Sequence, residues 1–394
     1  MKGDRGTIPV ASISSNESHS KPDRSKENGS SGTIYFLSPP SLQENLSNMI
    51  RVALIGSTGY TALEVARILL SHEKAELTIA TSRSDEGKPL SEIHPSLAGR
   101  CDVALQPFDP KTIAENADVA MCCLPHGASA ESVRDLALAG IRVIDFSADF
   151  RLSSVPLYEK WYGVTHPWPD RVGNVVYGMP EFFGDEIANA DVVANPGCYP
   201  TSAIMPLAPL VKAGLIEADD IIVDSKSGVS GAGRSPKLGT LYCEANESIA
   251  AYAIASHRHG PEMQDLIHRI ADKTVNVLFT PHLTPMDRGI LSTIYARPVL
   301  QDNDTVESVS SRLMAQLRDT YRDHPFVHVV DHLPATKHVA MTNHVQMTVR
   351  VSGNEDQPGR VIIVCAIDNL SKGASGAAIQ NMNVMFGIDQ MTGL

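Results

Sequence analysis

The sequence predicts an α/β protein: a doubly wound parallel sheet of Rossmann type, followed by an α+β domain with a mixed sheet. From residue 51 onward, short and almost continuously apolar runs alternate with helical segments, as in a parallel sheet covered on both faces. A glycine-containing turn follows the first of these runs. Beyond about residue 199 the apolar runs are longer, some alternate with polar residues, and few helical segments separate them, which favours a mixed sheet.

Composition excludes several classes of protein. The 394 residues are 43% hydrophobic and 20% charged, which is ordinary globular usage, and the net charge is −12. Such an acidic chain is a poor general binder of nucleic acid or anionic membranes. No run of 18 apolar residues suggests a transmembrane helix. The six cysteines include no CxxC pair and are too sparse for a disulfide scaffold, so we expect a cytoplasmic protein with reduced thiols.

The N-terminal segment differs from the rest of the chain. Eleven serines lie among the first 50 residues, with little apolar periodicity, so residues 1–48 are predicted to be disordered. The segment lacks the apolar core of a secretory signal, and its acidic residues speak against an organellar transit peptide. Met49 directly precedes the first apolar run, so we interpret the segment as a dispensable extension or an over-long start.

The remaining chain divides into three parts. Residues 49–198 are expected to form the nucleotide-binding domain, with strands at 51–55, 76–82, 118–124, 141–147 and 191–195 and helices near 64–72 and 129–139. Residues 199–365 are expected to form an α+β domain, with strands at 221–231, 275–283, 289–299, 344–353 and 360–369. Residues 366–394 include a helical stretch that we expect to return to the first domain.

A turn between the first strand and helix is suited to a dinucleotide. Glycines permit a tight turn there and let backbone N–H groups approach a pyrophosphate at a helix N-terminus. The spacing is GxxGxxA rather than GxGxxG, so an ordinary βα turn is the alternative. The candidate cofactor-binding residues in this turn are Gly56, Ser57, Thr58, Gly59, Tyr60 and Thr61.

The end of the second strand indicates which dinucleotide is bound. NAD sites usually place an acid there for the ribose hydroxyls, whereas this chain has Ser82, Arg83 and Ser84. Hydroxyls and a guanidinium suit a 2′-phosphate, which favours NADP(H). The alternative is that Arg83 is a solvated surface residue.

Cys198 is the candidate nucleophile. It lies in the string NPGCYPT, after a predicted strand and at the start of a predicted helix. A thiol at a helix N-terminus lies at the positive end of the helix dipole, so we expect its pKa to be lowered. The other cysteines lack this setting and are interpreted as structural.

A proton carrier is available in the string HRHGPE. Imidazole titrates near neutral pH, so either His257 or His259 could exchange a proton with the thiol, and the sequence does not separate them. His-x-His could also bind a metal, but no further ligands stand at a telling spacing, so no metal is expected.

Two arginines are candidates for binding an anionic substrate. Arg151 lies in DFRL, and Arg234 ends a glycine-rich loop that could cradle an anion. A nicotinamide cofactor, an activated thiol, an acid–base histidine and an anion site together indicate acyl-phosphate reduction through a thioester, or its reverse.

Over residues 49–394 the chain resembles N-acetyl-γ-glutamyl-phosphate reductases of arginine biosynthesis, which are related to aspartate-semialdehyde dehydrogenases. The resemblance rests on strings that occur in the family's order: IGSTGYTALEV, TSRSDEGKPLSEIHP, CLPHGAS, DFSADFRL, YGMPE, NPGCYPTSA, SGVSGAGRSP, HRHGPEM, FTPHLTPMDRGILSTIYA and DNLSKGASGAAIQNMNVMFG. The family's turn commonly reads GYTG, and Ala62 here stands in for the last glycine, a replacement that such turns tolerate.

The resemblance implies a reaction and roles for residues. Cys198 would attack the γ-acyl phosphate, NADPH would reduce the thioester to N-acetylglutamate 5-semialdehyde, and one of the two histidines would act as acid–base catalyst. Asn369 and Lys372 would lie near the nicotinamide. The resemblance also implies that residues 199–365 form the catalytic and dimerisation domain. The family forms homo-oligomers, so a dimer or tetramer is expected, without nucleic-acid or membrane partners.

Two alternatives remain open at this point. A sister reductase acts on an N-acylated aminoadipyl phosphate, and one methylene is worth only about 1–3 kcal/mol in a binding pocket. A nucleotide-binding regulator that has lost catalysis is the second alternative, although Cys198 and both histidines are intact.

Overall fold

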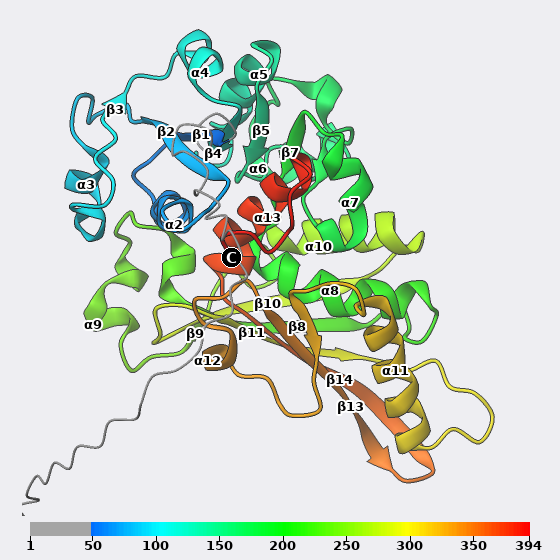
Figure 1. Cartoon of the computed structure of the whole chain (residues 1–394). Coiled ribbons are helices and arrows are strands. Elements are labelled where there is room, and N and C mark those ends of the chain that lie inside the picture. Colours follow the sequence, from blue (N-terminus) through cyan, green and yellow to red (C-terminus); the bar gives the residue numbers. More distant parts are fainter. Residues whose placement is uncertain (1–48) are drawn as a thin grey trace, which may run out of the picture. The chain divides into compact units, whose positions relative to one another are not determined.

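The computed structural model describes residues 49–394, which contain two seven-stranded sheets (Figure 1). The segment 1–48, for which the sequence predicts disorder, lies outside the described residues. The first sheet is formed by residues 50–194 and the second by residues 221–367. The predicted combination of a parallel and a mixed sheet is therefore confirmed.

The first sheet is parallel at every strand pair. Its strand order is β3-β2-β1-β4-β5-β7-β6, which places β1 and β4 at its centre. Carboxyl ends of neighbouring parallel strands meet at one edge, where ligands bind in open α/β sheets. The strands are β1 (Ile50–Ile55), β2 (Ala75–Thr81), β3 (Leu105–Gln106), β4 (Val119–Cys122), β5 (Arg142–Asp145), β6 (Val176–Tyr177) and β7 (Val192–Ala194).

Helices cover both faces of this sheet because its strands are apolar on both sides. In β1, Val52 and Leu54 belong to one buried core, while Ala53 and Ile55 belong to another on the opposite face. The C-terminal helix α13 (Gly376–Met385) contributes Ile379 and the methionines near it to the first of these cores. The other helices of this region are α2 (Tyr60–Leu69), α3 (Leu90–Ile93), α4 (Pro110–Asn116), α5 (Ala130–Leu138), α6 (Val155–Tyr162) and α7 (Pro180–Ala188).

The second sheet is mixed, with the order β12-β13-β14-β11-β8-β10-β9. The pairs β12/β13 and β8/β10 are parallel and the other neighbours are antiparallel. The strands are β8 (Ile221–Gly228), β9 (Ala250–Ala251), β10 (Val277–Thr284), β11 (Ile290–Ala296), β12 (Val327–Val329), β13 (Val345–Asn354) and β14 (Gln357–Ile367).

Three long helices pack on one face of the second sheet: α8 (Cys198–Lys212), α10 (His259–Ala271) and α11 (Val306–Thr320). The expectation of few helices in this region was therefore wrong. Burial alternates along β8, where Ile221 and Val223 face these helices and Ile222 stays partly exposed on the other side. Two short helices, α9 (Tyr242–Ala245) and α12 (Thr336–Val339), lie outside this layer.

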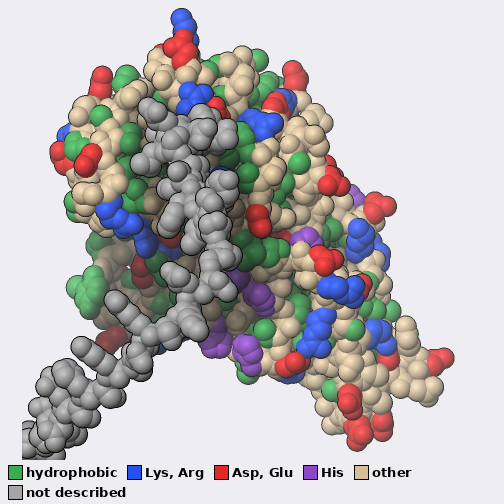
Figure 2. Space-filling view, viewed as in Figure 1, with side chains coloured by type: hydrophobic (Ala, Val, Ile, Leu, Met, Phe, Trp, Pro, Cys, Tyr) green, Lys and Arg blue, Asp and Glu red, His purple; other side chains and the backbone are tan. Residues whose placement is uncertain are grey.

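Charged side chains are distributed rather than segregated. Figure 2 shows acidic and basic groups interspersed over the visible face of the described residues. Among residues 49–394, no helix combines the length and the apolar composition needed to cross a membrane.

Candidate active site

A cleft of about 1250 Å³ runs along the carboxyl edge of the first sheet and reaches α10. Both sheet regions contribute to its wall. Most of the residues predicted for the site line it: Gly56, Ser57, Thr58, Gly59, Thr61, Ser82, Arg83, Ser84, Arg234, His257 and His259. Tyr60, Arg151, Cys198, Asn369 and Lys372 are not among the lining residues.

The β1–α2 turn forms one end of the cleft. Gly56 has a φ of +79°, and an added Cβ would lie 2.8 Å from Leu124 Cδ2, so only glycine fits this position without strain. Ser57 donates its hydroxyl to the Leu54 carbonyl and stays buried. Gly59 precedes α2 without a side-chain cap, which leaves the first N–H groups of the helix free to bind an anion.

Arg83 lines the same end of the cleft and makes no hydrogen bond or ion pair with any residue from 49 onward. The neighbouring hydroxyls of Ser82 and Ser84 both donate to the Asp85 carboxylate, which also pairs with Lys88. These hydrogen bonds hold the pKa of Asp85 below its ordinary value. The Arg83 guanidinium is therefore the free polar group at this position.

Cys198 is the first residue of α8 and is partly buried at the opposite end of the site. The preceding Gly197 allows close packing, because an added Cβ would lie 2.8 Å from His259 Nε2 and 2.9 Å from Arg151 Nη1. On its other side, a Cβ at Gly373 would lie 2.9 Å from the Cys198 Cβ. The thiol is thus enclosed between the histidine helix α10 and the turn before α13.

The two histidines occupy different positions. His259 Nε2 adjoins Gly197, next to Cys198, while its Nδ1 is buried without a hydrogen-bond partner among the described residues. His257 Nδ1 accepts the N–H of His259 at 3.1 Å, so the neutral ring of His257 carries its proton on Nε2. The rings lie 4.8 Å apart. This geometry favours His259 as the partner of Cys198.

Burial controls the protonation of these groups. It raises the pKa of Cys198 to about 11, although the Tyr199 N–H and the Arg151 charge act in the opposite direction. The expected lowering of the thiol pKa is therefore wrong for the free protein, because desolvation outweighs the helix N-terminus. Burial and then the Arg258 charge lower the pKa of His257 to about 4, and burial also lowers that of His259. Thiol and imidazoles are all neutral at pH 7.

Glu262 connects several segments of the site, and no role was predicted for it from the sequence. Its buried carboxylate accepts the Gly197 N–H at 2.9 Å and the Tyr177 hydroxyl at 2.8 Å, and it pairs with Arg151 at 3.2 Å. Since Glu262 and His259 share α10, this carboxylate fixes the histidine relative to the Cys198 turn. The spacing of the two residues along one helix was the available sequence signal.

Arg151 and Arg234 are both bound to protein acceptors. Arg151 is 4% exposed, and it donates to the Asn195 and Phe146 carbonyls besides pairing with Glu262. Arg234 lines the cleft and donates to the carbonyls of Thr58 and Ile93, so it braces the cofactor turn. Both guanidinium groups therefore already donate hydrogen bonds to protein acceptors.

Asn369 and Lys372 also have internal partners. Asn369 accepts the Gly289 N–H at 2.7 Å and donates to the Ser230 hydroxyl. Lys372 is 1% exposed, with its Nζ 2.6 Å from both Glu181 Oε1 and Gln380 Oε1. Both residues hold the segment before α13 in place, and neither side chain faces the cleft.

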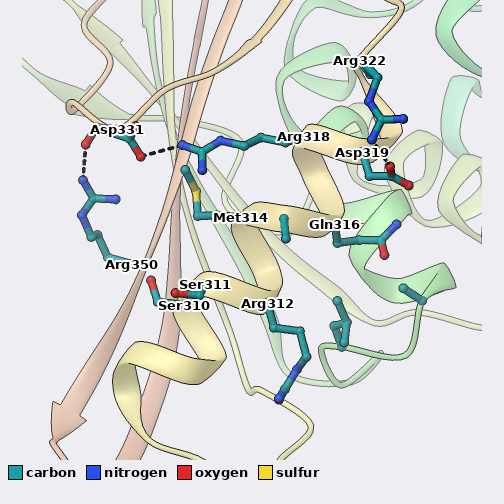
Figure 3. Close-up of a pocket in the computed structure, with 13 residues that line it drawn as sticks. Ser310, Ser311, Arg312, Met314, Gln316, Arg318, Asp319, Arg322, Asp331 and Arg350 are labelled. Atoms are coloured by element: carbon teal, nitrogen blue, oxygen red, sulfur yellow. Dashed lines mark hydrogen bonds and ion pairs between the residues drawn. The ribbon is translucent and has the colours of Figure 1, made fainter.

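A second groove, of about 1030 Å³, lies along α11 and β13 (Figure 3) and contains no predicted site residue. Its arginines already have partners: Arg318 and Arg350 both bind Asp331, and Arg322 pairs with Asp319. Among the described residues no cluster of three or more histidines, cysteines or acids is arranged to hold a metal. The first cleft is therefore the candidate active site.

Two family models match the chain. Residues 51–190 match the NAD binding domain of semialdehyde dehydrogenases, and residues 198–369 match their dimerisation domain. An N-acetyl-gamma-glutamyl-phosphate reductase from Rhodopirellula baltica is 73% identical over 348 residues, which cover 88% of this chain and 99% of the relative. The chain belongs to this reductase family. A reductase of the same name from Citrifermentans bemidjiense is 46% identical, with 88% and 98% covered.

Solved structures of this fold include aspartate semialdehyde dehydrogenases. One from Vibrio cholerae aligns with a TM-score of 0.64 at 18% identity and covers 86% of this chain and 98% of that one. One from Candida albicans, determined with NADP, has the same score at 14% identity, with 86% and 99% covered. The chain is thus an oxidoreductase of the semialdehyde dehydrogenase type, with an NAD(P)-binding domain.

Proposed function

We propose that this protein catalyses the NADPH-dependent reduction of N-acetyl-L-glutamyl 5-phosphate to N-acetyl-L-glutamate 5-semialdehyde and phosphate, in arginine biosynthesis. The observation that carries the proposal is the placement of Cys198 beside His259, which lines the same cleft as the dinucleotide turn. The 73% identity to a reductase named for this substrate supports the choice of acyl phosphate.

The cleft fits a nicotinamide dinucleotide. The turn at Gly56–Gly59 and the uncapped start of α2 would hold the pyrophosphate through backbone N–H groups. The free guanidinium of Arg83 would hold a 2′-phosphate, which supports NADP(H) over NAD(H). When bound, the reduced nicotinamide supplies a hydride.

The residues of the chain perform the acyl transfer. His259 accepts the thiol proton as Cys198 attacks the acyl carbon, so that the thiolate forms only during attack. The carbon–oxygen bond to phosphate breaks, phosphate leaves with its electron pair and takes up a proton from solvent, and a thioester on Cys198 remains. N–H groups at the start of α8 and the Arg151 charge stabilise the negative charge that develops.

The same residues complete the reduction. Once a hydride has reached the thioester carbon, the protonated His259 neutralises the resulting oxyanion. The carbon–sulfur bond of the thiohemiacetal then breaks, which releases the aldehyde and returns a proton to Cys198. Glu262 keeps α10 and the Cys198 turn in register through both steps.

The reverse reaction provides the test. With N-acetylglutamate semialdehyde, NADP⁺ and phosphate, the protein should form NADPH, and the rate should depend on phosphate. Cys198→Ser should abolish this activity, while the exposed Cys243→Ser serves as the matched control and should keep it. Full activity of Cys198→Ser would exclude the thioester mechanism.

Cofactor preference has its own test. Arg83→Ala should raise the KM for NADP⁺ far more than the KM for NAD⁺, because only NADP⁺ carries the 2′-phosphate. Equal effects on the two KM values would contradict the assignment of Arg83.

The dimerisation domain also supports a homo-oligomer. On the face of the second sheet opposite α8, strand register aligns four apolar side chains across β10, β8, β11 and β14: Leu278, Ile222, Tyr295 and Ile362. We propose that a second copy of the chain packs on this apolar row, because Leu278 is 52% exposed and the others are only partly covered.

A further inference from the structure

Four cationic side chains among the described residues line the cleft, and they differ in what they bind. Lys237 donates to a carbonyl of its own loop, Arg234 braces the cofactor turn, and Arg83 lies at the 2′-phosphate end. The fourth, Arg258, stands between His257 and His259 in the sequence and lies at the reactive end of the cleft. No role was predicted for Arg258 from the sequence.

Arg258 has no protein acceptor. Its side chain is exposed to the cleft and forms no hydrogen bond or ion pair with any residue from 49 to 394. The guanidinium lies over the Tyr162 ring, with 5.1 Å from Cζ to the ring centroid, which orients it without using its N–H donors. All five donors therefore remain available to a ligand.

His126 lies on the same aromatic ring. Its ring centroid is 5.9 Å from that of Tyr162 in an edge-on arrangement, and it too lines the cleft. His126 Nδ1 accepts the Ala148 N–H at 3.0 Å, so the neutral ring carries its proton on Nε2.

The proposed substrate requires two anion sites. Its acyl phosphate must lie against Cys198 and the start of α8, where the reaction occurs. Its α-carboxylate lies at the other end of a short aliphatic chain and needs a cation that protein groups have not already engaged. Arg151 and Arg234 are engaged, so neither meets this requirement.

We propose that Arg258 binds the α-carboxylate of the substrate, with the Nε2–H of His126 as a second donor and Tyr162 as the platform that holds both. This inference rests on the proposed function and names its carboxylate subsite. A guanidinium can bind a carboxylate through two parallel hydrogen bonds, which would fix the substrate's orientation as well as its affinity.

The reverse reaction separates the two anion sites, because aldehyde and phosphate then bind as separate substrates with separate KM values. Arg258→Gln should raise the KM for the semialdehyde about tenfold to hundredfold, as expected for loss of a charge-assisted contact. The KM values for phosphate and NADP⁺ should stay within about twofold. Arg258→Lys should recover only part of the loss, because an ammonium cannot form the paired contact.

Arg269→Gln is the matched control, since Arg269 is also on α10 but lies over Phe183 rather than in the cleft. It should leave all three KM values unchanged. A semialdehyde whose α-carboxylate is converted to an amide provides the second readout. It should bind the wild-type protein weakly, and Arg258→Gln should not weaken it further.

Two outcomes would overturn the proposal. A selective rise in the KM for phosphate would place Arg258 in the phosphate site and overturn the proposal, as would three unchanged KM values. Arg258→Gln should keep the wild-type melting temperature, because its side chain is exposed and unpaired. If the wild-type protein forms no NADPH in the presence of phosphate, the proposed function fails instead.

Discussion

At the scale of single residues, Cys198 is subject to two opposing influences. The N–H groups at the start of α8 and the Arg151 charge favour the thiolate, whereas burial between Gly197 and Gly373 disfavours it more strongly. The free protein thus holds a protonated thiol beside a neutral His259. A protonated thiol is less readily oxidised than a thiolate.

Alkylation rates test this protonation state. Because the pKa of Cys198 is raised to about 11, little thiolate exists at pH 7, and the rate of alkylation by iodoacetamide should still be rising at pH 9. The measurement uses the Cys243→Ser variant, which removes the exposed thiol. A plateau near pH 7 would show that the helix N-terminus outweighs burial.

The contacts of Glu262 could not be predicted from the sequence. Its place in HRHGPEM next to the histidines is visible, but its contacts with Gly197, Tyr177 and Arg151 join segments that are 65, 85 and 111 residues apart. Only tertiary packing brings these segments together. For the same reason the sequence could not show that the donors of Arg151 are occupied by this network.

Replacing this carboxylate should destabilise the protein. Glu262→Gln keeps an acceptor for Gly197 and Tyr177 but leaves the Arg151 charge buried without its counter-ion, which should cost about 3 kcal/mol of unfolding free energy. Urea denaturation measures this cost. Asp319→Asn, which breaks the exposed pair with Arg322, is the control and should cause no measurable change. Equal stability of Glu262→Gln and wild type would contradict the network's role.

At the scale of elements, the sequence predicted long apolar strands well and short ones poorly. β4, β5 and β7 lie within predicted runs, and β1 and β2 each begin one residue before theirs, because strands buried on both faces must be continuously apolar. The strands β3 and β6 were missed, since each has only two residues. The helix α11 was missed because its apolar residues form a narrow stripe in a largely polar segment.

The β1–α2 turn gives a prediction at this scale. Gly56→Ala should destabilise the protein more than Gly140→Ala, although both glycines have φ values near +80°. An alanine at Gly140 meets no atom within 4 Å and carries only backbone strain of about 1–2 kcal/mol, whereas at Gly56 it also collides with Leu124. Thermal unfolding of the two variants compares these costs. Equal losses would mean that the turn can relax and that close packing does not require glycine there.

At the scale of the whole molecule, the proposed ligands of this chain are anions, although its net charge is −12. Arg83, Arg151 and Arg234 were predicted from the sequence to bind anions, and the structure brings Arg83 and Arg234 into one cleft. Beside the histidines, the cation without a protein acceptor is Arg258, whereas Arg151 is hydrogen-bonded. This difference depends on which carbonyls and carboxylates the fold brings next to each guanidinium. Composition alone cannot make this distinction.

The apolar row on the second sheet predicts how copies of the chain associate. Leu278→Asp should place a charge in this interface and reduce the mass in solution to that of one chain, as light scattering would measure. Leu300→Asp is the control, because Leu300 is equally exposed, at 50%, but lies outside the row. An unchanged mass for Leu278→Asp would exclude this face as the interface.

The most direct test of the central claim is a single-turnover measurement without phosphate. Mixing the protein with NADP⁺ and N-acetylglutamate semialdehyde should produce a burst of one NADPH per active site, because the thioester on Cys198 forms but has no phosphate to attack it. Adding phosphate should then start steady turnover, and Cys198→Ser should show neither phase. A burst of the same size in Cys198→Ser, or steady turnover without phosphate, would contradict a thioester carried by Cys198.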